Sequence, residues 1–137
     1  MITFTLPMRP LSKLRPRLGK GGRVITPKAT RTYERELALR AGVELGGETL
    51  LGPLELHLEF VFARTDSSPK GEGRLPRTCI PDLDNLAKAV MDGLSAARAW
   101  EDDRQVSRLT AAKWWGARGE DSSITVSLGK HRGGEAS

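Results

Sequence analysis

One segment of this chain alternates regularly between apolar and polar side chains, and it limits the folds that the chain can adopt. Every second residue from Leu54 to Phe62 is leucine or phenylalanine, and Glu55, His57 and Glu59 lie between them. Side chains of a β-strand point alternately to its two faces, so this pattern predicts a strand with one buried face. Such a strand belongs to a sheet that other elements cover on one side.

The rest of the chain alternates between strand and helix patterns and contains no internal repeat. Two stretches have helical spacing, and Gly46 with Gly47 is expected to end the first of them. The order β-α-β-α-β-β predicts an α+β fold of two layers, with the helices packed on one face of a mixed sheet. Besides the strand at 54–62, the elements are expected at residues 2–6, 30–45, 84–98, 106–115 and 124–128.

The length of the chain and its single cysteine limit the class of protein. A chain of 137 residues is expected to form one domain, here residues 1–128 followed by a disordered tail at 129–137. No apolar run is long enough to cross a bilayer, and the first residues lack the pattern of a signal peptide. Because Cys79 is the single cysteine, an internal disulfide and a multi-cysteine zinc site are excluded. Cys79 itself is expected to be a small buried residue.

The charge is divided unevenly along the chain. Residues 1–40 contain ten lysines and arginines but two acids, a net charge of +8, whereas residues 41–137 have a net charge of −3. Basic residues are concentrated in two expected loops, 8–29 and 64–81, which suit a polyanion such as nucleic acid, although they could also be merely solvated. The residues expected to bind nucleic acid are Lys13, Arg15, Arg17, Lys20, Arg23, Lys70, Arg74 and Arg77.

Acidic residues lie at both ends of the second expected helix. Asp82 and Asp84 are at its start, Asp103 follows its end, and Lys88 lies one turn beyond Asp84. Singly, each aspartate would most often be a helix cap or part of a turn, and Lys88 an exposed ion-pair partner. Together they provide the hard oxygen ligands that hold Mg²⁺ or Mn²⁺, between loops able to bind phosphates. This combination favours a metal-dependent nuclease.

Two sequence blocks resemble the RusA family of Holliday junction resolvases. These are PDLDNLAKAVMDGL at 81–94 and WEDDRQV at 100–106. The resemblance implies a cytoplasmic, nucleoid-associated, bacterial or phage endonuclease that acts as a homodimer on four-way DNA junctions. It implies Mg²⁺ as the metal, with Mn²⁺ as a substitute, and neither a membrane nor a small-molecule cofactor. The family's essential aspartates fall on Asp82, Asp84 and Asp103, and its essential lysine on Lys88.

Other functions stay open at this point. The stretch 65–80 looks like an insertion relative to the family, which bears on how DNA is engaged and not on the metal site. One alternative is a DNA-structure-binding protein that has lost cleavage, and another is a flap or fork nuclease on the same fold. Trp114 and Trp115 could stack on bases, but packing in the core or in a dimer is the preferred interpretation.

Overall fold

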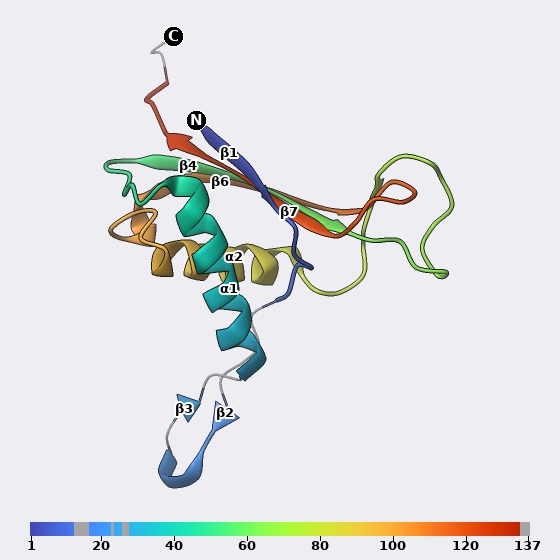
Figure 1. Ribbon diagram of the computed structural model, residues 1–137, viewed down its shortest axis with the longest axis horizontal. Helices are drawn as coiled ribbons and strands as arrows, with labels where there is room; N and C mark the ends of the chain where they lie inside the picture. Colours follow the sequence, from blue (N-terminus) through green and yellow to red (C-terminus); the bar gives the residue numbers. More distant parts are fainter. Residues whose placement is uncertain (13–16, 23, 26–27, 135–137) are drawn as a thin grey trace.

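Two helices cross each other on one face of a five-stranded sheet (Figure 1). The structure is a computed structural model that describes residues 1–12, 17–22, 24–25 and 28–134. Along the chain the elements are β1 (Ile2–Leu6), β2 (Arg17–Leu18), η1 (Lys20–Gly22), β3 (Val24–Ile25), α1 (Lys28–Leu45), β4 (Leu54–Phe62), β5 (Leu75–Pro76), α2 (Leu83–Ala96), η2 (Asp103–Gln105), β6 (Val106–Trp115) and β7 (Ser123–Lys130), where η marks a short 3-10 helix.

The central strand of the sheet is β4, the segment with the regular alternation. The strand order is β1-β7-β4-β6-β5, in which β4 runs antiparallel to β7 and parallel to β6. The parallel pair requires a crossover between β4 and β6, and this crossover contains α2. The predicted mixed sheet with helices on one face is therefore confirmed.

The core lies between the sheet and the two helices. Leu54, Leu56 and Phe60 of β4 are fully buried there, and each contributes about 1.5–3 kcal/mol relative to an exposed side chain. The helices approach each other closely at Gly93 of α2, where an added Cβ would lie 2.4 Å from the Cδ2 atom of Leu37 in α1. Only glycine leaves room for this packing.

Both helices end as the sequence suggests, with small shifts of boundary. Gly46 and Gly47, which follow α1, have positive φ angles of 61° and 78°, the conformation that glycine adopts most easily. Helix α2 ends before Arg98, whose φ of 62° is incompatible with a continued helix. In the described part of the chain, no helix is long and apolar enough to cross a membrane.

Three expectations about the chain are corrected. The expected loop at 8–29 contains a small antiparallel ribbon, because β2 pairs with β3. The expected tail begins too early, since Gly129 and Lys130 pair with β4 in β7 and the amide of His131 donates to the carbonyl of Pro53. Cys79 is exposed rather than buried, because it lies in the turn before α2 and not on a strand or helix that faces the core.

Candidate active site

Asp82 and Asp84 lie together at the start of α2, with both side chains exposed. Asp82 is the N-cap residue, with an extended backbone (φ −68°, ψ 143°), yet its carboxylate accepts no capping hydrogen bond. Asp82 therefore does not cap the helix with its side chain, which is the usual role of an aspartate at this position. Asp84 follows in the first helical turn, where the helix dipole favours negative charge. Both carboxylates are left available to a ligand.

Two cationic side chains hold the turn that leads into Asp82. The ammonium of Lys113 donates to the carbonyls of Cys79 and Pro81, both at 2.8 Å. The guanidinium of Arg77 donates to the intervening carbonyl of Ile80 at 2.7 Å. Charged hydrogen bonds to three successive carbonyls fix the path of the backbone immediately before Asp82.

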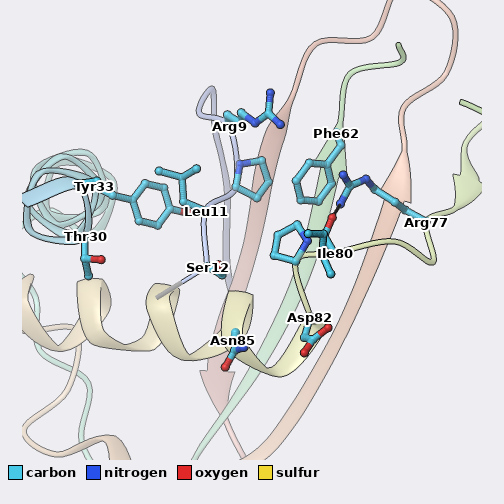
Figure 2. A pocket seen from close by; sticks show the side chains of 13 residues that line it. Arg9, Leu11, Ser12, Thr30, Tyr33, Phe62, Arg77, Ile80, Asp82 and Asn85 are labelled. Atoms are coloured by element: carbon cyan, nitrogen blue, oxygen red, sulfur yellow. Dashed lines mark hydrogen bonds between the residues drawn. The ribbon is translucent and has the colours of Figure 1, made fainter. Parts of the chain in front are cut away.

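Arg77 is itself fixed by aromatic rings. Its guanidinium carbon lies 3.9 Å from the centre of the Phe62 ring and 4.8 Å from the centre of the Trp115 ring. Figure 2 shows Arg77 next to Phe62. Such cation–π contacts stabilise a guanidinium that is partly removed from water. Trp115 is buried, which confirms the core-packing interpretation for this residue, whereas Trp114 on the other face of β6 donates its indole N–H to Glu59.

Lys88 lies on an exposed position of α2, one turn beyond Asp84. Among the described residues it forms no salt bridge with Asp84 or with any other acid. Lys88 is therefore not part of a structural i,i+4 ion pair with Asp84. The ammonium is available on the same end of the helix as the two aspartates.

Asp103 is presented by a compact turn built from its neighbours. The carboxylate of Asp102 accepts the backbone N–H of Arg104 at 2.8 Å, while the side-chain oxygen of Gln105 accepts the backbone N–H groups of Glu101 and Asp102. The hydrogen bond from the Arg104 backbone, reinforced by its guanidinium, lowers the pKa of Asp102. Asp102 and Gln105 thus shape η2, and Asp103 is left exposed within it.

The structure does not bring Asp103 to the other two aspartates within one chain. The 14 residues of α2 span about 21 Å at the usual helical rise, with Asp82 before one end and η2 beyond the other (Figure 1). Strand β6 gives a similar separation, because Lys113 lies seven residues after Val106, or about 23 Å along an extended strand. Within the described ranges, no three acidic, histidine or cysteine side chains are grouped to hold a metal ion.

A cavity of about 630 Å³ opens beside Asp82. Figure 2 shows it between Tyr33 of α1, Leu11 after β1, and Asp82 with Asn85 at the start of α2. Burial raises the pKa of Tyr33 to about 12, against the opposing effect of the nearby Leu11 backbone. Its phenol therefore stays neutral at physiological pH. The cavity gives room next to Asp82.

The basic residues expected to bind nucleic acid are used in different ways. Lys20 and Lys70 are exposed, whereas Arg77 holds the turn described above. Arg74 forms a salt bridge with Glu120 at 2.6 Å, and this hydrogen bond lowers the pKa of Glu120 and raises that of Arg74. Arg17 lies in β2, and Lys13, Arg15 and Arg23 are outside the described residues.

The long loop between β4 and α2 is anchored at several points. Arg64 donates to the carbonyls of Gly71, Gly73 and Gly116, the last at 2.7 Å. With the Arg74 salt bridge, these contacts fasten the segment that was interpreted as an insertion.

Lys113 is the site residue that the sequence analysis did not single out. In the register of β6 it lies opposite Phe60 and belongs to the row of side chains that faces the helices. The other members of that row are Leu109, Ala111 and Trp115. One lysine at an inward position among apolar residues was the available signal, because a buried ammonium needs acceptors.

The comparisons with known proteins agree with the motif. The family model described as Endodeoxyribonuclease RusA matches residues 7–127. No curated protein matches the chain closely enough to count as a relative. The family match includes both acidic blocks. It also includes the strands of the sheet, except for β1 and the last residues of β7.

Proposed function

Because the chain belongs to the RusA family of Holliday junction-resolving endodeoxyribonucleases, we propose that it cleaves four-way DNA junctions by paired, symmetric, Mg²⁺-dependent nicks. The observation that carries the metal dependence is the state of Asp82. It occupies an N-cap position without capping the helix, and it stands two residues from Asp84, whose carboxylate is also exposed. Two free carboxylates on a fixed turn fit a hard divalent cation.

The residues proposed to hold the metal are Asp82 and Asp84 of one subunit together with Asp103, which in a dimer would come from the second subunit because it lies at the other end of α2 within one chain. When bound, Mg²⁺ (or Mn²⁺ in its place) activates water for in-line attack on the phosphodiester and stabilises the leaving oxygen. Lys88 neutralises charge at the scissile phosphate or orients the water, which requires the ammonium to be free of intramolecular ion pairs. The turn clamped by Lys113 and Arg77 keeps Asp82 in place while the substrate binds.

The proposed enzyme is a homodimer. A four-way junction requires two cuts on strands related by a two-fold axis, and one chain has one pair of aspartates at the start of α2. A C2 dimer supplies two equivalent sites. The exposed lysines Lys20 and Lys70 are proposed to contact the DNA backbone, together with the basic residues of the segment before α1.

Cleavage of matched substrates tests this function. Junction, fork, flap and duplex DNA are incubated with the protein with and without Mg²⁺, and Asp82→Asn serves as the inactive control. We expect Mg²⁺-dependent cleavage of the junction, and Asp82→Asn should bind the junction as tightly as wild type or more tightly because a negative charge near phosphate is removed. Binding without cleavage under all conditions would favour the DNA-structure binder, and preferred cleavage of flaps or forks would favour the other nuclease.

A further inference from the structure

The cavity beside Asp82 extends to helix α1 and has the size of a ligand pocket (Figure 2). Its volume of about 630 Å³ is in the range of pockets that hold small organic molecules. Tyr33 of α1 lines one side, Leu11 follows β1, and Phe62 lies with Ile80 on the other side. A chemical group bound in this cavity would lie directly beside the proposed catalytic aspartate.

Two buried polar atoms in the wall of this cavity have no hydrogen-bond partner. Among the described residues, the buried side-chain atoms in this state are the hydroxyl oxygen of Tyr33 and Nε of Arg77. Both residues line the cavity. Buried polar groups are almost always paired, because an unpaired group loses its hydrogen bonds to water without replacement. Their place in the wall of one cavity indicates a ligand that supplies the missing partners.

Tyr33 is the more informative of these two residues. Its side chain is 6% exposed, and Figure 2 shows its ring pointing from α1 toward Leu11. Because the pKa of its phenol is raised to about 12, the hydroxyl keeps its proton at physiological pH and is a hydrogen-bond donor. The wall therefore offers a neutral donor to a ligand that carries an acceptor.

The rest of the wall favours a nucleobase over a phosphate group. A base has apolar faces and an edge of donors and acceptors, so it needs both kinds of contact. The positive charge of Arg77 is already engaged by two rings and the carbonyl of Ile80, and the carboxylate of Asp82 would repel an anion. The apolar residues of the wall are Pro10, Leu11, Phe62, Ile80 and Pro81.

We propose that this cavity receives one nucleobase extruded from the DNA beside the scissile phosphate, and that the Tyr33 hydroxyl donates to an acceptor on the edge of that base. The inference rests on the proposed function, since it places the base next to Asp82. Extrusion costs least where stacking is already interrupted, and the branch point of a four-way junction interrupts it. Tyr33 is thus a specificity-determining residue, and it makes cleavage depend on the base next to the cut.

A fluorescent base tests whether extrusion occurs, without any cleavage. Junctions carry 2-aminopurine at successive positions around the branch point, and the protein is added without Mg²⁺. At one position next to the cleaved phosphate, emission should rise at least about threefold, because a base that leaves the stack loses its quenching neighbours. If no position responds although a gel shift shows bound junction, the inference is wrong, while Mg²⁺-dependent cleavage of the same junction would leave the proposed function standing.

Filling the cavity should abolish the fluorescence rise. Ala29 lines the cavity and is exposed at the start of α1, so Ala29→Trp should fold normally and occupy the space of the base. The matched control is Leu39→Trp, which places the same ring on an exposed position of α1 outside this cavity. A rise that persists in Ala29→Trp, or that is lost equally in Leu39→Trp, would contradict the assignment of the base to this cavity.

Tyr33→Phe tests the role of the hydroxyl itself. Because the variant removes an unpaired buried group, its urea midpoint should equal or exceed that of wild type, whereas a structural hydrogen bond would make it lower. Single-turnover cleavage is measured on four junctions that differ in the base at the responding position, and on a fifth that is abasic there.

Wild type should prefer one base by about tenfold, and Tyr33→Phe should reduce this preference to about twofold, since one hydrogen bond in the cavity is lost. The abasic junction should be cleaved about tenfold more slowly than the preferred one by wild type, because no base enters the cavity. Equal cleavage of all five junctions by wild type, or a preference that Tyr33→Phe leaves unchanged, would overturn the inference. The absence of any junction cleavage would instead refute the proposed function.

Discussion

Replacement of Lys113 by methionine tests whether the turn before Asp82 is held in place by its ammonium. Methionine keeps the length and apolar stem of the side chain and removes the two hydrogen bonds to the carbonyls of Cys79 and Pro81. Hydrogen bonds to a charged group contribute about 1.5–3 kcal/mol each, and the exposure of Cys79 puts this pair toward the low end. We expect a loss of about 3 kcal/mol in unfolding free energy, or about 10 °C in Tm.

The effect on cleavage should exceed the effect on folding. A displacement of Asp82 by about 1 Å is enough to lower the rate of a positioned reaction on the order of 10²-fold. Single-turnover cleavage at a temperature where the variant is folded measures this loss, and a gel shift should find junction binding unchanged. A raised Mg²⁺ requirement distinguishes a displaced carboxylate from general destabilisation, and Lys113→Arg should restore part of the activity because arginine can still donate to both carbonyls.

The matched control is Lys130→Met, which removes an exposed lysine from the end of β7. Its stability and cleavage rate should equal those of wild type. The reasoning is refuted if Lys113→Met also unfolds at the wild-type denaturant concentration and cleaves within about twofold of the wild-type rate, since a positioning role predicts a loss on the order of 10²-fold.

Three further outcomes are expected. Lys88→Arg should lose on the order of 10²-fold in single-turnover cleavage with unchanged Tm, because a planar guanidinium does not replace a compact ammonium; near-normal cleavage would remove it from the catalytic set. Gly93→Ala should destabilise the protein by about 1–3 kcal/mol in urea unfolding, since its methyl group would overlap α1; an equal or higher stability would show that α1 repacks freely. Arg74 lowers the pKa of the Glu120 carboxyl, so this group should stabilise the fold above its unfolded pKa of about 4.3 and lose that contribution as the pH falls through its folded value. The unfolding free energies of wild type and Glu120→Gln should therefore differ at neutral pH and converge in acid. A constant difference across that range would contradict the assignment.

The local pattern of side chains was sufficient to predict most of the elements. Alternation in β4 and in β7 reflects a geometric rule of the extended backbone, and helix-ending glycines such as Gly46 act through their own φ angles. The ribbon of β2 and β3 and the extension of β7 to Lys130 were missed, because each depends on a partner strand that supplies the backbone hydrogen bonds.

The amino-acid sequence by itself determined which residue types are available for chemistry and their order along the chain. It identified the acidic blocks and the family to which they belong, because motif spacing is a property of the chain. Only the tertiary structure decided that Asp82 is free of a capping bond and that Lys113 holds the turn beside it. Lys113 lies 32 positions after Pro81 and reaches its carbonyl only because β6 packs beside the start of α2, and local side-chain patterns do not determine such a contact.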